Sequence, residues 1–250
     1  MVVITPDHLK QLIAIEALVH YAIPPPSGQA PFIAIQRDSS VLLSAPHGAR
    51  TFRNTADETW HEEDEYTAGL ALLLSDLCGT SVIATVWRTD DSDPNYHREP
   101  HSSFKQSLRE MMQSMGVRWV IDLHGAKWNT SKMETNQWID LGTRRELISL
   151  PTKYLQQFEK LLEDKLGKGV VHHNGYPARE ESRTITAFVH GELLQQAVQV
   201  EMKPIIRVPL RRTDASRYTS DGPYTAPVEN VIGLMQALVD FIRYIKTGGE

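Results

Sequence analysis

Residues 102–125, SSFKQSLREMMQSMGVRWVIDLHG, decide the fold class of this chain. Ser102 or Ser103 can cap a helix, and Gly116 is typical of a helix end. Between them the apolar side chains recur at the spacing of one helical face: Phe104, Leu108, Met111, Met112 and Met115. Residues 119–123 then form a short apolar run, which predicts a buried strand. A helix followed at once by a buried strand is typical of an α/β fold.

The same alternation extends in both directions from this stretch. Helical patterns begin at Pro6 and cover 66–77, 154–162 and 231–242, and strand patterns cover 32–35, 41–45, 82–87, 137–141, 184–189 and 197–202. We expect 32–35 and 41–45 to pair with each other, because only the turn-like residues 37–40 stand between them. The alternation predicts a largely parallel or mixed sheet covered by helices on both faces. In such a sheet, functional sites form at the carboxyl ends of the strands.

The composition is that of an ordinary globular protein, and we expect one domain spanning residues 1–250. The chain is 41% hydrophobic and 23% charged, with a net charge of −5. It has no long block of Lys or Arg, which argues against a nucleic-acid partner. The single cysteine, Cys78, cannot form an internal disulfide or a thiolate metal cage, which fits a reducing cytoplasm. No apolar run approaches the roughly 20 residues of a membrane helix. We therefore expect a cytoplasmic protein that does not bind a membrane, and the sequence leaves open whether it forms a homo-oligomer.

Two histidines stand at predicted strand ends. His47 lies in residues 44–48 (SAPHG) and His124 in residues 122–125 (DLHG). Each is followed by a glycine, which lets the backbone approach another segment closely. Asp122 lies on the same strand face as His124 and can orient its imidazole or share its pocket. Either histidine alone is more simply explained as a polar strand end, but the pair favours metal ligation.

A third ligand is required, because a catalytic zinc usually takes three protein ligands and keeps a fourth position for water. The candidates lie in residues 60–66 (WHEEDEY), an acidic run at the start of the predicted helix 66–77. Acidic residues complement the helix dipole, and this explains most of the run without a metal. Glu63 would lie on the buried helical face and Asp64 could cap the helix. The spacing does not choose between them.

Two later charged residues are candidates for catalysis and substrate binding. Glu201 interrupts an otherwise apolar strand. Burying a carboxylate costs free energy, so such a group is usually paired with another group or has a functional role. Beside a metal it would act as a general base and later protonate the departing nitrogen, and the alternative is a strand end facing solvent. Arg183 can hold a substrate carboxylate with its two-pronged guanidinium, although a surface role explains it equally well.

The motifs of several other enzyme classes are absent from the sequence. There is no Gly-x-Ser-x-Gly elbow, P-loop or Gly-x-Gly-x-x-Gly fingerprint, which argues against a serine hydrolase and a nucleotide cofactor. The His-Glu-x-x-His helix of many zinc proteases is absent too.

In its motifs the chain resembles the N-formylglutamate amidohydrolase family, and more distantly the zinc carboxypeptidase and aspartoacylase group. Residues 45–48 (APHG) are similar to the family's Pro-His-Ser-Gly, and residues 63–66 (EDEY) resemble its acidic-aromatic helix start, with Asp64 at the acidic position. Arg88 and residues 93–95 (DPN) are similar to an arginine followed by Asp-x-Asn-Arg, but Tyr96 stands where the last arginine is expected.

Further matches follow in the family's order. Residues 121–125 (IDLHG) resemble Asp-x-His-Ser, and residues 141–143 (LGT) are similar to the Leu-Gly that comes after it. Residues 183–186 (RTIT) lie where a Gly-rich Tyr-Ile-Thr segment is expected, and residues 199–201 (QVE) are similar to Gln-x-Glu. Each motif is short, and their shared order and spacing carry the resemblance.

The resemblance implies a three-layer α/β/α sandwich around a central mixed, mostly parallel sheet, of the phosphorylase/hydrolase-like class. It also implies one zinc ion, held by His47, Asp64 and His124. With that ion, an activated water molecule would attack the amide bond of a small N-acylated amino acid, N-formyl or similar.

The resemblance also implies roles for the residues around the metal. Glu201 would move protons, and Arg88, Asn95 and Arg183 would position an acidic substrate. One alternative is a carboxypeptidase-like or cell-wall amidase activity. Another is a binding protein that keeps the fold and has lost turnover, which the residue Tyr96 makes conceivable.

Overall fold

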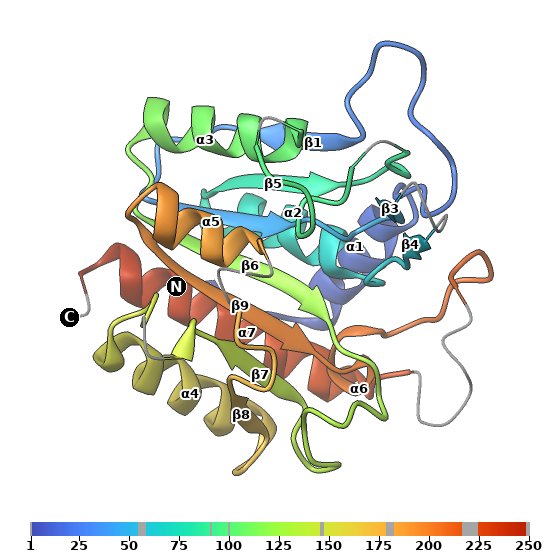
Figure 1. Ribbon diagram of the computed structural model, residues 1–250. Helices are drawn as coiled ribbons and strands as arrows, with labels where there is room; N and C mark the ends of the chain where they lie inside the picture. The colour runs from blue at the N-terminus through green and yellow to red at the C-terminus, as the bar shows by residue number, and fades with distance from the viewer. Residues whose placement is uncertain are drawn as a thin grey trace.

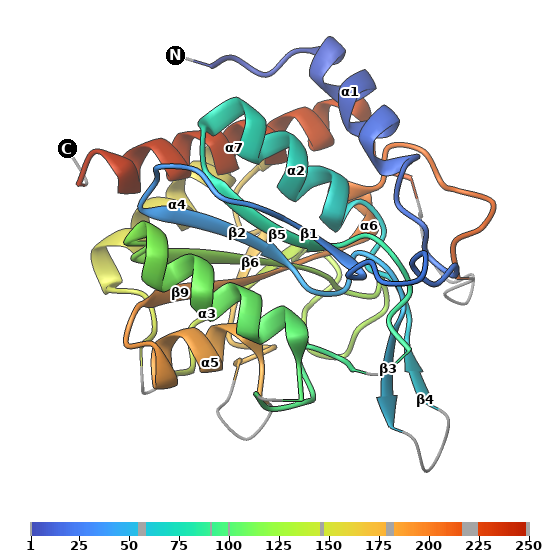
Figure 2. The same ribbon diagram turned by 90° about the horizontal axis from the view of Figure 1, so that it is seen from above.

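The central feature is a mixed β-sheet. The computed structural model describes residues 2–54, 59–90, 92–99, 101–145, 148–178, 183–216 and 225–248. Within these residues seven strands form the sheet, in the spatial order β1-β5-β2-β6-β9-β7-β8. They are β1 (Phe32–Ile35), β2 (Val41–Ala45), β5 (Ser81–Thr85), β6 (Trp119–Gly125), β7 (Ile139–Gly142), β8 (Val171–His173) and β9 (Gln196–Met202). A separate antiparallel hairpin, β3 (Thr51–Asn54) and β4 (Thr59–His61), projects beyond the end of the sheet (Figure 2).

The middle of the sheet is parallel. β2 pairs in parallel with both β5 and β6, β6 pairs in parallel with β9, and β7 does so with β8. Antiparallel pairing joins β1 to β5 and β7 to β9, so the sheet is mixed but mostly parallel. Because the parallel strands end at the same edge, the residues that follow β2 and β6 lie close together.

Helices cover both faces of the sheet (Figure 1). They are α1 (Pro6–Glu16), α2 (Thr67–Cys78), α3 (Ser103–Met115), α4 (Thr152–Leu166), α5 (Ile185–Glu192), α6 (Pro204–Arg207) and α7 (Val228–Lys246). The apolar side chains of α1, α2, α4 and α7 form one large core with the sheet. On the other face, Phe104 of α3 and Phe188 of α5 belong to a second core with Leu42 and Ile83. The predicted three-layer α/β/α fold is confirmed.

Local sequence signals explain where two of these helices begin and end. The Ser102 hydroxyl accepts the backbone N–H of Lys105 and caps α3, and Gly116 ends the helix with φ +63°. Gly79 ends α2 in the same left-handed conformation. None of the helices in the described part of the chain is long and apolar enough to cross a lipid bilayer.

Two expectations about strands are wrong. Strands 32–35 and 41–45 do not pair with each other, because β5 lies between them and pairs with both. The five residues of β5 are all buried, so β5 takes the interior position and leaves the half-exposed β1 at the edge. Residues 184–189 belong to α5 and its cap rather than to a strand, since the Thr184 hydroxyl accepts the N–H of Ala187 at 3.2 Å. The β-branched residues of this run suggested a strand, but the cap and the packing of Phe188 on the sheet favour a helix.

Candidate metal centre

His47 and His124 lie at the ends of neighbouring parallel strands. His47 comes two residues after β2, and His124 is the second-last residue of β6. The glycine that follows each one has no room for a side chain. A Cβ at Gly48 would lie 2.4 Å from a side chain of α2, and a Cβ at Gly125 would lie 2.6 Å from the guanidinium of Arg207 and 3.0 Å from the Cβ of Asp64. The backbone after each histidine therefore packs closely against another segment, as the sequence predicted.

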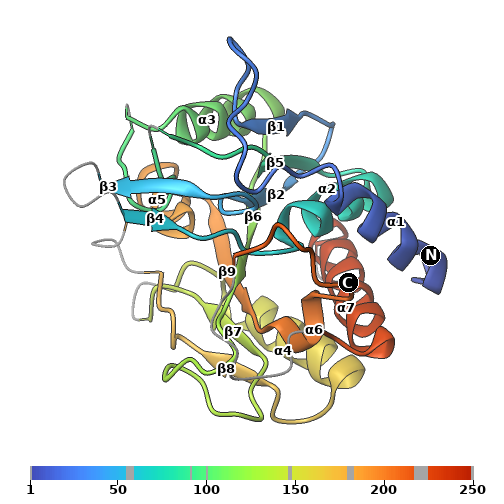
Figure 3. The same ribbon diagram turned by 90° about the vertical axis from the view of Figure 1, so that its right-hand side faces the viewer.

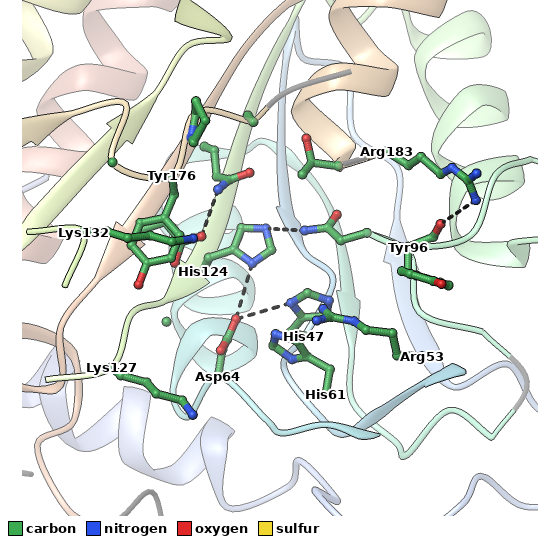
Figure 4. Close-up of a pocket in the computed structure, with 18 of the residues that line it drawn as sticks. His47, Arg53, His61, Asp64, Tyr96, His124, Lys127, Lys132, Tyr176 and Arg183 are labelled. Atoms are coloured by element: carbon green, nitrogen blue, oxygen red, sulfur yellow. Dashed lines mark hydrogen bonds and ion pairs between the residues drawn. The ribbon is translucent and has the colours of Figure 1, made fainter. Parts of the chain in front are cut away.

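Asp64 reaches the same place from a strained turn before α2. Tyr66 has φ +67°, a left-handed conformation that is costly for a residue other than glycine. The Asp64 carboxylate lies between the two imidazoles (Figure 4), with Oδ2 3.3 Å from Nδ1 of His124 and 3.6 Å from Nδ1 of His47. One ligand atom of each of the three buried residues lies within 4.8 Å of the others.

Each imidazole also contacts a second buried carboxylate. Nε2 of His47 lies 2.9 Å from Oδ1 of Asp93, and Nε2 of His124 lies 3.2 Å from Oδ2 of Asp122. These contacts orient both rings so that the Nδ1 atom of each is directed toward the Asp64 carboxylate. Metal-binding histidines are commonly oriented in this way.

Unsatisfied polar atoms mark the space between the three side chains. Nδ1 of His47 and Oδ1 of Asp64 are buried and have no hydrogen-bond partner among the described residues. Buried polar atoms rarely lack a partner, and a cation among these atoms would satisfy them. Two imidazole nitrogens and a carboxylate oxygen are a donor set that suits zinc, with a fourth position open. The residues present therefore fit the metal that the resemblance implies.

The charges of the cluster depend on one another. Burial raises the pKa of Asp64, but the adjacent imidazoles of His124 and His47 outweigh burial and hold that pKa well below its usual value. Burial lowers the pKa of His124, but Asp122 and Asp64 together raise it well above the ordinary value. The Asp64 carboxylate thus stays ionised among the imidazoles, as a metal ligand must be.

Glu63 and Asp64, the two candidates for the third ligand, are distinguished by the groups that each carboxylate contacts. Both carboxylates are buried, but Glu63 is engaged away from the histidines. Oε2 of Glu63 accepts the Ser216 hydroxyl at 2.7 Å and Nε of Arg50 at 2.9 Å. Asp64 lies beside the two histidines instead. Its side chain does not cap α2, because only its backbone carbonyl accepts hydrogen bonds from Thr67.

Glu201 lies on β9, directly across from His124 in the register of the sheet. Its carboxylate lines the cavity beside the histidines and is only 7% exposed. Oε1 accepts a hydrogen bond from the side-chain amide of Gln199 at 2.8 Å. Burial raises the pKa of Glu201 to about 7, with Asp64 and Asp140 adding to the rise and His124 opposing it. A carboxyl with this pKa can both accept and return a proton near neutral pH.

A cavity of about 820 Å³ adjoins the cluster and includes Asn95 and Arg183 in its lining. Nδ2 of Asn95 lies 3.1 Å from Nε2 of His124, and its Oδ1 accepts the N–H of Ile185. Arg88 is not part of this lining. Its guanidinium pairs with Asp90 at 2.6 Å, because that carboxylate lies only two residues further along the chain. The structure therefore brings Asn95 and Arg183 to the centre and places Arg88 elsewhere.

Several lining residues were not among those singled out from the sequence. They are Arg53, His61, Lys127, Lys132, Arg145 and Tyr176. His61 stacks on His47 with ring centres 3.8 Å apart, and burial together with His47 lowers its pKa to about 3. Its position next to the acidic run was the one available signal. The others lie in loops and a hairpin whose positions depend on tertiary packing.

The comparisons with known proteins concern the fold. No protein-family model and no curated protein matches the sequence. Among solved structures, the chain is similar to N-formylglutamate amidohydrolase from Ralstonia eutropha, with a TM-score of 0.54 and 14% identity over 88% of this chain and 100% of that one. The fold is shared.

Two further solved structures share it. A bacteriophage poly-gamma-glutamate hydrolase gives a TM-score of 0.51 and 14% identity over 90% of this chain and 94% of that one. A Zn-dependent exopeptidase from Parabacteroides distasonis gives a TM-score of 0.51 and 9% identity over 96% of this chain and 98% of that one. The likeness therefore includes the family that the motifs resemble and a zinc exopeptidase.

Proposed function

We propose that this chain is a zinc-dependent amidohydrolase that cleaves the amide bond of a small N-acylated amino acid, N-formyl or similar. The observation that carries the proposal is the buried cluster of His47, Asp64 and His124, whose ligand atoms lie within 4.8 Å of one another beside a cavity. The fold shared with an N-formylglutamate amidohydrolase supports it.

The chain's own residues prepare the cluster for a metal. Asp93 and Asp122 orient the two imidazoles, so that both Nδ1 atoms are directed toward the Asp64 carboxylate, where the metal would bind. When bound, zinc would lower the pKa of a water molecule toward about 7 and polarise a carbonyl oxygen.

Glu201 supplies the proton transfers in this proposal. Its carboxylate lies beside the cluster, and its pKa of about 7 lets it take a proton from the attacking water near neutral pH. The same group then returns the proton to the departing amide nitrogen, and this regenerates the carboxylate. Asn95 and Arg183 line the cavity and would hold the acidic part of the substrate.

Metal analysis and a substrate screen test the proposal together. The purified protein should bind about one zinc ion per chain. The loaded protein should release amine from at least one N-acylated amino acid. Chelation should abolish this activity and zinc should restore it. A protein that binds zinc but hydrolyses none of the N-acylated amino acids or short peptides offered would support the binding-protein alternative instead.

The same screen separates the two hydrolase alternatives. A preference for peptides with a free C-terminus over N-acylated amino acids would indicate the carboxypeptidase-like activity. The zinc exopeptidase of similar fold makes this comparison necessary.

A further inference from the structure

The cavity beside the metal centre carries an excess of positive charge. Its lining includes the carboxylates Asp64 and Glu201. Against these stand the basic side chains Arg53, Lys127, Lys132, Arg145 and Arg183. A cavity lined mainly by one sign of charge concentrates ligands of the opposite sign. These cations differ in whether the protein itself neutralises them and in where they lie relative to the metal centre.

Lys132 and Tyr176 form one side of the cavity. Nζ of Lys132 lies 4.0 Å from the centre of the Tyr176 ring, and the Tyr176 hydroxyl lies 2.7 Å from Oγ1 of Thr130. No ion pair joins Lys132 to a carboxylate of the described residues. The ring therefore orients the ammonium group without cancelling its charge.

The loop that carries Tyr176 is fixed from below by a buried carboxylate. Asp140 accepts the backbone N–H groups of Gly175 and Tyr176 at 2.8 and 2.9 Å. This side of the cavity is therefore held in place before any ligand binds.

Arg183 and Tyr96 lie on the opposite side of the histidine cluster (Figure 4). Nη1 of Arg183 donates to the Tyr96 carbonyl at 3.3 Å, and no carboxylate of the described residues pairs with its guanidinium. The backbone at Arg183 is held by Lys105, a buried side chain. Its ammonium group donates to the carbonyl of Arg183 at 2.7 Å and to that of His97 at 2.8 Å. The remaining N–H groups of Arg183 can bind an anion.

Arg53 differs from Lys132 and Arg183. It lies near His47 but pairs with Asp93 at 2.8 Å, so its charge is balanced within the protein. Lys132 and Arg183, whose charges no carboxylate of the described residues balances, therefore stand on the two flanks of the centre (Figure 4).

We propose that the substrate is anionic on both sides of the scissile amide, with one anionic end held by Lys132 and the other by Arg183. This inference rests on the proposed amidohydrolase function, because it takes the reacting amide to lie at the histidine cluster between them. A formyl group carries no charge and would leave one flank without a partner. An acyl group that itself carries a carboxylate would engage both flanks, as when one acidic residue is joined to another through an amide.

Three synthetic compounds isolate the charge at each end. N-succinyl-L-glutamate is anionic on both sides of its amide. N-butyryl-L-glutamate lacks the acyl-side carboxylate at the same chain length, and N-propylsuccinamic acid lacks the carboxylates on the amine side. Their dissociation constants are measured by calorimetry with the Glu201→Gln protein after zinc addition, because binding can then be read without turnover.

We expect N-succinyl-L-glutamate to bind about tenfold or more tightly than either of the other two compounds. Lys132→Met should abolish the preference for a carboxylate at one end of the ligand, and Arg183→Met should abolish the preference for a carboxylate at the other end. Each variant should keep the wild-type preference at the opposite end. Lys10→Met, a change of an exposed lysine on α1, is the matched control and should change neither.

Equal binding of the succinyl and butyryl compounds would overturn the inference, even if the wild-type protein hydrolyses both of them. Conversely, tight and two-sided binding without hydrolysis by the wild-type protein would sustain the inference about the ligand and reject the proposed hydrolase. The two failures are therefore distinguishable.

Discussion

The carboxylate of Glu16 accepts the backbone N–H of Tyr66 at 2.8 Å, and this contact stabilises the left-handed turn that presents Asp64. The same carboxylate accepts the N–H of Gly69 at 2.8 Å and the hydroxyl of Tyr21. Glu16 is fully buried at the end of α1, so a single side chain joins α1 to the first turn of α2. The position of a candidate zinc ligand thus depends on a residue that does not touch the metal centre.

Replacing Glu16 with Gln should destabilise the protein. The side-chain NH₂ of Gln cannot accept a hydrogen bond, so the N–H of Tyr66 or of Gly69 would lose its buried acceptor. We expect a loss of about 1–3 kcal/mol in the free energy of unfolding, measured by urea denaturation. Glu110→Gln, at an exposed position of α3, is the control and should change stability little. Equal stability of the two variants would contradict this role for Glu16.

The stability of the wild-type protein should fall as the pH rises from about 4.5 to about 7. Burial raises the pKa of Glu16 from 4.5 to about 7 in the folded state, although Tyr21 and two backbone N–H groups oppose the rise. The folded state therefore binds more protons than the unfolded state in this interval. The stabilisation is complete below the unfolded pKa and is lost as the pH rises through the folded pKa. The free energy of unfolding measured at several pH values should show this slope in the wild type and a weaker slope in Glu16→Gln.

Asp64→Asn and Glu63→Gln form a matched pair that tests the third ligand. Asp64→Asn removes a charged ligand atom between the histidines, and we expect zinc affinity to fall by about tenfold or more. Glu63→Gln should keep its zinc and lose stability, because Glu63 bonds Ser216 and Arg50 instead. Zinc titration with a competing chelator measures the affinities. Loss of zinc from the Glu63 variant with retention by the Asp64 variant would reverse the assignment.

Glu201→Gln should retain zinc and lose turnover. Glutamine has a similar shape but cannot accept or donate the proton, so we expect kcat to fall by roughly 10²- to 10⁴-fold. Metal content and kcat are measured on the same preparation, because a loss of zinc would by itself lower kcat and would hide the effect of the missing carboxylate. Gln199→Leu is the neighbouring control. It removes the amide that donates to Glu201, and we expect a much smaller fall in kcat because the carboxylate remains. A zinc-loaded Glu201→Gln protein with wild-type turnover would remove Glu201 from proton transfer.

The alternation of apolar and capping residues was enough to predict the fold class and most of the elements. The α3 pattern with Ser102 and Gly116, and the apolar run of β6, each form as predicted because they depend on neighbouring residues. The order of strands could not be predicted in the same way. The position of β5 between β1 and β2 results from a crossover through α2, which covers one face of β5 while α3 covers the other. No feature of residues 32–45 records this position.

The sequence by itself determined which chemical groups stand at the ends of strands. His47, His124 and the glycines after them, the acidic run before α2 and Glu201 within β9 are all local features, because strand ends and helix starts depend on near neighbours. Only the tertiary structure decided which carboxylate joins the histidines. Asp64 lies beside them and Glu63 does not, because Glu16 holds the strained turn at Tyr66 and Ser216 engages Glu63 from a distant part of the chain. Tertiary packing also placed Lys132 and Arg183 on opposite flanks of the centre, since their loops follow different elements that meet only when the sheet is assembled.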